Sequence, residues 1–452
     1  MNTDRLSLYK DFEVINAIDP EIYARLDVKR GLRNTDGTGV IAGVTNISNV
    51  HGYVLNEAEK QPCEGRLTMR GYDINDLVAH VEAEDRFGFE ELAYLLLAGR
   101  LPTVEQLASF RKLIDENREL PDGFCADIIM TKATPNVMNA LTRAISVLYA
   151  FDKDAESNAP EHEIDTAISL ISRLPRVMVL AYYAKRAVFF GDSMIMHRFI
   201  PGQSTSETIL SMLRPDRKFT HEEAALLDIM LMLHAEHGGG NNSTFIVRAL
   251  TSSDTDPYSA YAGGIGSLKG ARHGGANLQV EQMQDDIKQQ VANWSDEGQV
   301  ADYLRKIVRR EAFDRSGLIY GMGHAVYTLS DPRALLCKKH AIQLAKGTPF
   351  EDEFELLQTI ERLAPGIIAE QKGDSKQICA NIDMYSGLVY RMLGIPQDLL
   401  TPMFASSRIV GWAAHRFEEI ISGRRIMRPA YKSNVTSPST PRLPYVPLQE
   451  RV

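Results

Sequence analysis

The chain has 452 residues, of which 44% are hydrophobic and 24% are charged, and its formal net charge is -9 at pH 7. This composition is that of a globular protein with enough length for a large core or two domains, and it excludes a chain that is disordered throughout. The negative net charge argues against a broad surface for nucleic acid or membrane, so any anion site must be local.

The cysteines and the N-terminus indicate the cellular setting. Cys63, Cys125, Cys337 and Cys379 lie far apart without paired spacing, which predicts neither a zinc site nor a disulfide framework and favours a reducing compartment. The first residues lack the basic and then apolar order of a signal peptide, and no apolar run approaches the roughly 18 residues that span a bilayer. We therefore expect a cytoplasmic protein.

The predicted elements begin with a single β region, Gly39 to Gly71, where Gly, Asn, Ser and β-branched residues alternate in short runs. From Phe89 onward apolar residues recur at helical spacing, and a Thr-x-x-Glu pattern predicts a helix from Thr220 to Glu236. Glycines at 238–240 end that helix, so His237 continues its apolar stripe into a turn. The predicted fold class is mainly α with a small N-terminal β region.

A second predicted helix, Asp256 to Ala271, is rich in glycine and alanine and leads directly into Arg272 and His273. Because each glycine weakens a helix by about 1 kcal/mol, this composition favours very close packing against another backbone, such as one at a subunit interface. Beyond Tyr431 serine and proline are frequent, and we expect residues 432–452 to form a tail or an arm on a partner.

Two local motifs have alternative interpretations. Segment 37–42, Gly-Thr-Gly-Val-Ile-Ala, matches a loose dinucleotide-binding pattern, but a polar stretch precedes it instead of an apolar strand. His234 and His237 are one turn apart and with His273 would form a metal set, yet no carboxylate-rich zinc signature accompanies them. Histidines at the end of an apolar helical stripe are more often hydrogen-bonded core or site residues, so we predict no metal.

The informative pattern is spread over three segments that each set one ionisable side chain among residues that lack bulk. Segments 271–277, 321–327 and 381–387 contain His273, His324 and Asp383, respectively. Small neighbours let a ligand and backbone amides approach closely. Any one of these segments alone would be interpreted as an ordinary turn.

Three arginines strengthen this pattern. Arg333 follows the second histidine, and Arg408 and Arg428 stand in otherwise apolar surroundings, where an unpaired guanidinium would be costly to bury. Each therefore favours a carboxylate partner. For any one of them a structural salt bridge is the more common explanation.

In order from about Gly39 to Tyr431, these segments resemble those of citrate synthases. The most specific are Gly-His-Ala-Val at 323–326 and Ser-Asp-Pro-Arg at 330–333, while segments 65–73 and 95–103 resemble scaffold elements of that family. Met322 stands where an aromatic residue is often found, and Thr134-Pro135 stands where a His-Pro pair is common. The positions of the acid, the bases and the arginines show no departure.

The resemblance implies a role for each candidate residue. Asp383 would be the base that deprotonates the acyl-CoA, His273 the donor to the thioester oxygen, and His324 the donor to the ketone of oxaloacetate. Four residues would bind oxaloacetate, the last of them from a neighbouring subunit: His237, Arg333, Arg408 and Arg428. The backbone that would lie against CoA belongs to Gly321, Met322, Gly323 and Ala325.

The resemblance also implies a two-domain helical fold. A large domain, residues 1–277 and 387–452, would be interrupted by a small helical domain, residues 278–386. The active unit would be a homodimer, because the site would share an arginine across subunits. No metal or organic cofactor would be bound, since acetyl-CoA acts as a co-substrate.

The implied activity is that of an acyltransferase of the tricarboxylic acid cycle, which condenses acetyl-CoA with oxaloacetate and water to citrate and CoA. The alternatives are a 2-methylcitrate synthase that uses propionyl-CoA, a citryl-CoA lyase, and a catalytically inactive regulatory relative. One methylene in an apolar pocket is worth only about 1 to 3 kcal/mol, so the motifs do not separate the two synthases. The presence of His273, His324 and Asp383 argues against an inactive relative.

Overall fold

The computed structural model describes residues 16–34, 37–56, 59–373, 377–423, 425–434 and 444–450. It divides into two units, one made of the two ends of the chain, 1–41 and 426–452, and the other of residues 42–425. In the terminal unit a short helix, α2 (Pro20–Arg25), begins where the Asp19 carboxylate accepts the N–H of Glu21. Lys432 donates to the carbonyl of Leu26 at 2.7 Å and thereby joins the two ends.

The unit also contains the 3-10 helices η1 (Arg30–Leu32) and η6 (Leu448–Glu450). The predicted arm, residues 432–452, falls in this unit, but 435–443 and 451–452 lie outside the described residues. Its contact with a partner therefore stays a prediction.

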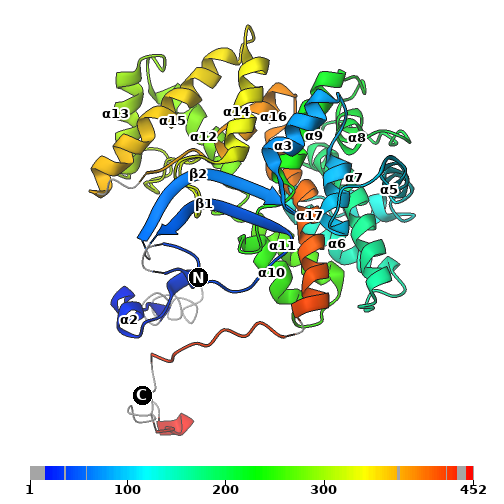
Figure 1. The fold of residues 1–452 in the computed structure, drawn as a ribbon, viewed down its shortest axis with the longest axis horizontal. Helices are drawn as coiled ribbons and strands as arrows, with labels where there is room; N and C mark the ends of the chain where they lie inside the picture. The colour runs from blue at the N-terminus through cyan, green and yellow to red at the C-terminus, as the bar shows by residue number, and fades with distance from the viewer. Residues whose placement is uncertain are drawn as a thin grey trace. The chain divides into compact units, whose positions relative to one another are not determined.

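A three-stranded antiparallel sheet opens the unit of residues 42–425. Its order is β1 (Ser48–Asn56), β2 (Glu59–Met69) and β3 (Tyr72–Asp73), and the register shifts between His51 and Tyr53 (Figure 1). This confirms the predicted small β region. Glycine in β1 and β2 lets the strands approach another backbone, because a Cβ atom on Gly52 would lie 2.8 Å from the carbonyl oxygen of Val326.

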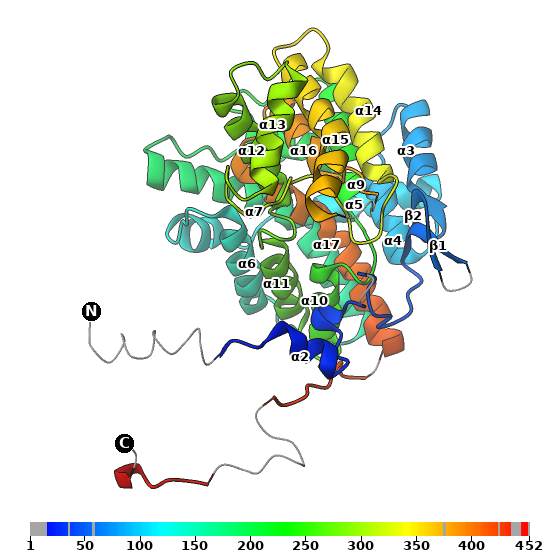
Figure 2. The ribbon, with the colours of Figure 1, turned by 90° about the vertical axis from the view of Figure 1, so that its left-hand side faces the viewer.

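The rest of this unit is mainly helical, as predicted. The larger group of helices comprises α3 (Ile74–Ala83), α4 (Phe89–Ala98), α5 (Val104–Glu116), α6 (Val137–Leu148), α7 (Pro160–Phe190), α8 (Thr205–Leu213), α9 (His221–His234), α10 (Asn242–Thr251), α11 (Pro257–Leu268) and α17 (Leu400–Glu418). The short helical turns comprise η2 (Cys125–Met130), η3 (Tyr149–Phe151), η4 (Gln397–Leu399) and η5 (Glu419–Gly423). α17 is buried from Leu400 to Arg416 and packs on α4, α7, α9, α10 and α11 (Figure 2).

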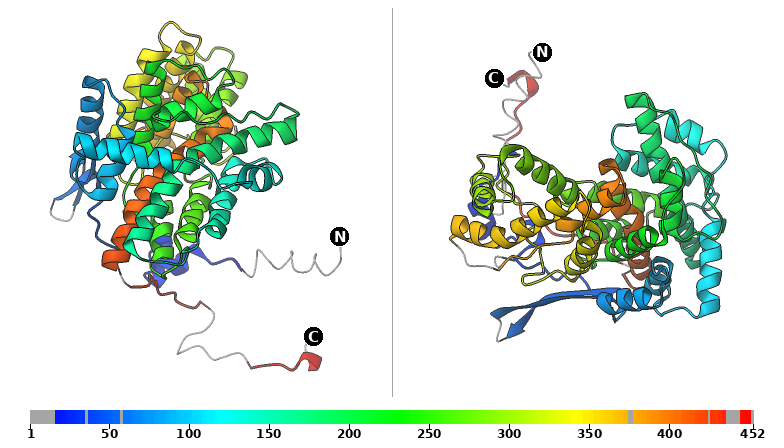
Figure 3. Two further views of the ribbon diagram at one scale, coloured as in Figure 1. Left: turned by 90° about the vertical axis from the view of Figure 1, so that its right-hand side faces the viewer. Right: turned by 90° about the horizontal axis from the view of Figure 1, so that it is seen from above.

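A second group of helices packs mainly on itself. It comprises α12 (Ala276–Gln290), α13 (Glu297–Val308), α14 (Pro332–Ala345), α15 (Glu351–Lys372) and α16 (Asp383–Met392). Figures 1 and 3 show this group on one side of the 42–425 unit, with α4 to α8 on the other. The expected boundaries at 277/278 and 386/387 stay a prediction, and the second of them falls inside α16.

Two predicted helices differ from the structure at their ends. α9 begins at the predicted capping box, since Thr220 and Glu223 each accept the other's backbone N–H, but it stops at His234. The carboxylate of Glu236 accepts the N–H of Gly238 instead and closes a turn. α11 ends at Leu268, before the predicted end.

The glycines of α11 are needed for close packing inside the chain. A Cβ atom on Gly264 would lie 2.7 Å from Val247 of α10, and one on Gly263 would collide with Leu250. The close packing inferred from composition is therefore present between α10 and α11, while a subunit interface here stays a prediction. Among the described helices, none combines the length and apolar character that a membrane crossing needs.

A fully buried ion pair joins the start of α7 to the end of α17. Arg416 donates to the carboxylate of Glu163 through Nε at 2.8 Å and Nη2 at 2.6 Å, and also to the hydroxyl of Thr251 at 3.0 Å. Removing one partner of such a pair leaves an uncompensated charge in the core.

We expect Glu163→Leu to lower the free energy of unfolding by about 3 to 5 kcal/mol, measured by denaturant titration. The double variant Glu163→Leu/Arg416→Met should recover most of this loss, because no buried charge then lacks a partner. Equal stability of the single and double variants would contradict this account.

Candidate active site

The residues predicted to bind a 2-oxo dicarboxylate include two histidines that the structure places together. The ring centroids of His237 and His324 are 4.8 Å apart, and Tyr327 stacks on His324 at 4.6 Å. The guanidinium carbon of Arg333 lies 6.0 Å from the centroid of the same tyrosine ring. The segments 234–240 and 322–333 therefore meet at one place, although they are far apart in the sequence.

Phe404 of α17 extends this cluster toward the other predicted residues. Its ring lies under the guanidinium of Arg408 at 4.7 Å, and its centroid is 6.5 Å from that of His273. The positive charges of Arg333 and Arg408 both act to lower the pKa of Asp383. The structure thus brings together the carboxylate, three histidines and two arginines that the sequence singled out.

Backbone hydrogen bonds fix which nitrogen of His324 carries the proton. The N–H groups of Val326 and Tyr327 both donate to Nδ1, each at 3.1 Å. Nδ1 therefore has no proton, and a neutral ring carries its proton on Nε2. Nε2–H is thus the hydrogen-bond donor of this side chain.

The tautomer of His273 is set in the opposite sense. The backbone N–H of Ser243, in α10, donates to Nε2 of His273 at 3.3 Å, and the serine hydroxyl lies 2.9 Å from the same nitrogen. The ring therefore carries its proton on Nδ1. Burial, and then the charge of Arg408, lower the pKa of His273 to about 4, so it is a neutral donor.

Asp383 is the first residue of α16 and is buried. The side chain of Asn381 accepts its N–H at 2.9 Å, while its Oδ1 has no hydrogen-bond partner among the described residues. Burial raises the pKa of Asp383 to about 7 and Asp331 adds to the rise, against the opposing charges of Arg333 and Arg408. A carboxylate with such a pKa is well matched to proton abstraction near neutral pH.

Arg408 has no exposed surface, yet its terminal nitrogens are unpaired. Nε donates to the carbonyl of His234 at 2.6 Å, whereas Nη1 and Nη2 have no hydrogen-bond partner in the described part of the chain. Burial lowers the pKa of Arg408 to about 9, although Glu236 opposes this. A buried guanidinium with a free fork is suited to a ligand carboxylate.

Two further residues predicted to bind the oxo-acid, Arg333 and His237, differ in whether their side chains already have hydrogen-bond partners. Arg333 is buried and already paired with Asp331, at 2.7 Å from Nη2 and 3.1 Å from Nε. His237 is buried and its Nε2 lacks a hydrogen-bond partner among the residues described. Burial, followed by the charge of Arg333, holds the pKa of His237 well below its usual range, so its ring is neutral.

Arg428 belongs to the terminal unit, where its side chain is exposed. Its role in a neighbouring subunit therefore stays a prediction.

The segment predicted to lie against CoA is tied to the segment that precedes Asp383. Gly323 donates its N–H to the carbonyl of Cys379 at 2.8 Å, and Asn381 donates to the carbonyls of Gly321 and Gly323 at 2.9 Å each. Both glycines have positive φ, +81° and +89°, which other residues rarely adopt. These hydrogen bonds join the segment before His324 to the segment before Asp383. They occupy backbone groups that were predicted to lie against CoA. Met322 bridges to Ala380 in the same pairing.

Sequence reasoning missed several residues that support the site. Asn381 and Ser243 orient its histidines and acid, and Glu236 and His415 form a buried pair behind Arg408. Asn381 and Ser243 are ordinary polar residues in sequence, so no signal distinguished them. The pairing of Glu236 with His415 is a contact between distant segments, so it could be found only in the structure.

The alternative of a metal site finds no support in the described ranges, where no group of three or more His, Cys, Asp or Glu side chains could hold an ion. His234, one of the three histidines in that alternative, packs its ring on Phe404 at 4.4 Å and on Tyr390 at 6.1 Å. It is a core residue that supports Arg408 through its carbonyl.

Comparison with known proteins identifies the family. The family model for the citrate synthase C-terminal domain matches residues 33–430. The citrate synthase of Deinococcus radiodurans is 34% identical over 366 residues, which cover 81% of this chain and 89% of that protein. The 2-methylcitrate synthase 1 of Corynebacterium glutamicum is 32% identical over 407 residues, covering 89% and 94%.

Solved structures show the same fold. The citrate synthase of Thermotoga maritima superposes with a TM-score of 0.72 at 26% identity and covers 92% of this chain and 99% of its own. The citrate synthase of Thermoplasma acidophilum, solved with carboxymethyl coenzyme A and oxaloacetate, superposes with a TM-score of 0.75 at 26% identity. This match covers 94% of this chain and 99% of that chain. The protein is thus an enzyme that transfers an acyl group. More particularly, the chain belongs to the citrate synthase family.

The raised pKa of Asp383 has a consequence for stability. Its ordinary value is 3.8 and its folded value is about 7, so between these pH values the unfolded chain has released a proton that the folded chain retains. The stability of the folded state therefore falls as the pH rises through this range.

Asparagine at this position cannot titrate, so the variant Asp383→Asn should not lose this stability. The free energy of unfolding of the variant minus that of the parent should therefore be about 2 to 3 kcal/mol larger at pH 8 than at pH 5. Thermal unfolding at both pH values, without substrates, measures this difference. Asp154→Asn, the same replacement at an exposed position, is the control. A constant offset for Asp383→Asn would contradict the raised pKa.

Proposed function

We propose that this protein is a citrate synthase, which condenses acetyl-CoA with oxaloacetate and water to give citrate and CoA. The observation that carries the proposal is a set of three side chains at one site that differ in charge and in hydrogen-bonding state. These are a buried carboxylate with a raised pKa, a neutral histidine donor, and a buried guanidinium with an unpaired fork. Each matches one demand of this reaction.

The first step is removal of a methyl proton from the thioester. This proton is very weakly acidic, so a modest base removes it only if the developing enolate oxygen receives a hydrogen bond at the same time. Asp383 is the base. His273 donates Nδ1–H to the thioester oxygen, a role that its accepting bond from Ser243 leaves open.

In the second step the new carbanion equivalent attacks the ketone of oxaloacetate. The ketone oxygen becomes an alkoxide and needs a proton or a strong donor, which Nε2–H of His324 supplies. Arg408 holds one substrate carboxylate through its free Nη1 and Nη2. His237 and Arg333 border the same site, and Arg428 reaches it from a neighbouring subunit of a homodimer.

Hydrolysis of the citryl thioester then releases CoA. We infer that oxaloacetate binding brings the two predicted domains together, which excludes bulk water and completes the CoA site. None of these steps assigns a task to a resident metal or organic cofactor, because the protons are moved by side chains.

A second candidate activity is that of a 2-methylcitrate synthase. Relatives of both kinds match this chain to a similar degree, for example 34% for a citrate synthase and 32% for a 2-methylcitrate synthase. Propionyl-CoA needs room for one more methylene, which is a small energetic difference in an apolar pocket. The same catalytic residues would serve both reactions.

The test of the function is the release of free CoA thiol in the presence of oxaloacetate, with acetyl-CoA and propionyl-CoA side by side. A higher kcat/KM for acetyl-CoA is expected. A higher value for propionyl-CoA would instead identify a 2-methylcitrate synthase, and no release with either would favour an inactive relative or a lyase.

Two substitutions should separate the base from the oxo-acid ligand. Asp383→Asn should lower kcat by about 100-fold or more, while calorimetry should show nearly unchanged oxaloacetate binding, because the base does not hold the oxo-acid. Arg408→Leu should raise the KM for oxaloacetate by about 10- to 100-fold, since a charged hydrogen-bonding fork is lost. Equal loss of oxaloacetate binding in both variants would show that the roles are assigned wrongly.

A further inference from the structure

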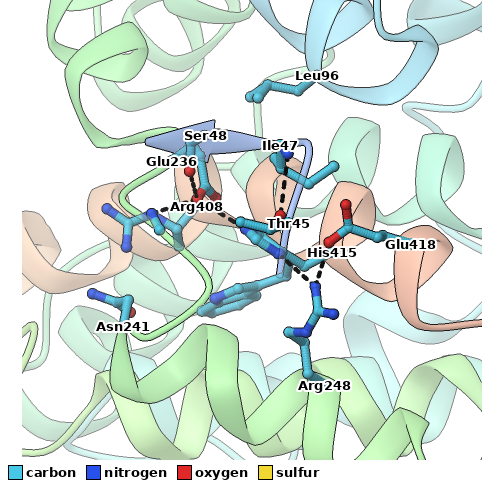
Figure 4. A network of polar contacts seen from close by, with 12 residues as sticks. Thr45, Ile47, Ser48, Leu96, Glu236, Asn241, Arg248, Arg408, His415 and Glu418 are labelled. Atoms are coloured by element: carbon cyan, nitrogen blue, oxygen red, sulfur yellow. Dashed lines mark hydrogen bonds and ion pairs between the residues drawn. The ribbon is translucent and has the colours of Figure 1, made fainter. Parts of the chain in front are cut away.

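A buried polar network lies behind Arg408 and is centred on Glu236 (Figure 4). The Oε1 atom of Glu236 accepts three hydrogen bonds: from Nε2–H of His415 at 2.9 Å, from the hydroxyl of Ser48 at 2.8 Å, and from the N–H of Gly238 at 2.5 Å. These donors come from α17, from β1 and from the loop after α9, respectively. One oxygen atom thus joins three separate elements.

The proton of His415 is directed toward Glu236 by an arginine on its other side. Arg248 of α10 donates Nη1–H to Nδ1 of His415 at 3.0 Å, and a guanidinium can only donate. Nδ1 therefore carries no proton, and Nε2–H points to the carboxylate. The charge of Arg248 is taken up by Glu418 at 2.7 Å and Glu419 at 2.8 Å.

Glu236 is placed between two residues of the proposed oxaloacetate site. It directly precedes His237, and the carbonyl of His234, two residues earlier, accepts Nε–H of Arg408. Its carboxylate rests against α17 at Gly411, one turn beyond Arg408, where a Cβ atom would collide with Oε2. The glycine therefore makes room for the carboxylate beside the helix that carries Arg408.

The charge of Glu236 has a clear partner in the site. Burial acts to raise the pKa of Glu236, but the hydrogen bonds from His415 and Ser48 and the charge of Arg408 hold it below the ordinary value, so the carboxylate is ionised. It in turn favours the charged form of Arg408. The guanidinium has no other hydrogen bond than that to His234 among the described residues, and this attraction is the larger of the two charge effects that offset its burial, the other being that of Asp383.

We propose that Glu236 and His415 are positioning residues for oxaloacetate: His415 holds Glu236, and Glu236 holds Arg408 and His237 in the orientation that receives the oxo-acid. Neither side chain touches the reacting atoms. The inference rests on the proposed function, since it names the groups that preset the oxo-acid half of that site. It predicts an effect on oxaloacetate and none on the acyl-CoA.

The test compares two replacements of His415. Phenylalanine keeps the ring but removes the donor, so His415→Phe should raise the KM and the dissociation constant for oxaloacetate by about 10-fold. The KM for acetyl-CoA should change by less than about 2-fold. His415→Gln keeps a donor that reaches Glu236 and should restore most of the oxaloacetate affinity, which a role in packing alone does not predict.

A matched control and a milder variant keep the test decisive. His162, at the start of α7, pairs with Asp152 at 2.9 Å, and His162→Phe should leave both KM values unchanged. Ser48 is only half-buried, so Ser48→Ala removes one of the three donors with little risk to folding. It should raise the KM for oxaloacetate by about 3-fold, and it decides the question if His415→Phe does not fold.

The outcomes separate this inference from the proposed function. If the unaltered protein neither binds oxaloacetate in a calorimeter nor releases CoA thiol with it, the proposed function fails and the inference fails with it. If the unaltered protein does both, and either the KM for oxaloacetate is unchanged in Ser48→Ala and His415→Phe or both KM values rise together, only the inference is overturned.

Discussion

The site depends on one buried charge that the chain itself does not fully satisfy. Arg408 has no exposed surface, donates Nε–H to the carbonyl of His234, and leaves two nitrogens unpaired within the described residues. A guanidinium is costly to bury in this way, and the cost is lowered by Glu236 and by the aromatic face of Phe404. Arg408 lies on α17, and the packing of this helix on α4, α7, α9, α10 and α11 sets the position of the guanidinium.

A single physical cause, loss of water, prepares the other groups in opposite ways. Burial lowers the pKa of His273 and His237 and raises that of Asp383. Arg408 reinforces the effect at both histidines, Arg333 reinforces it at His237, and both arginines oppose the rise at Asp383. The histidines therefore stay neutral and can donate, while the carboxyl group titrates near neutral pH. Residue type thus sets the direction of each pKa shift, and the backbone contacts of His324 and His273 set which ring nitrogen donates.

The sequence predicted the mainly α fold, the small β region and the start of α9, because these depend on local spacing and capping. It placed the end of α9 two residues too late, since the Glu236 side chain competes for the N–H of Gly238. The proximity of the glycine-flanked segments came from the family resemblance. The pairing of Glu236 with His415, 179 residues apart, had no local signal and required the structure.

The hydrogen bonds at His324 also bear on how freely its surroundings can vary. Both donors to Nδ1 are main-chain groups, which every residue except proline supplies. The placement of the proton on this ring therefore does not depend on which side chains occupy positions 326 and 327. Side chains at these two positions can therefore change by mutation while the proton stays on the same nitrogen.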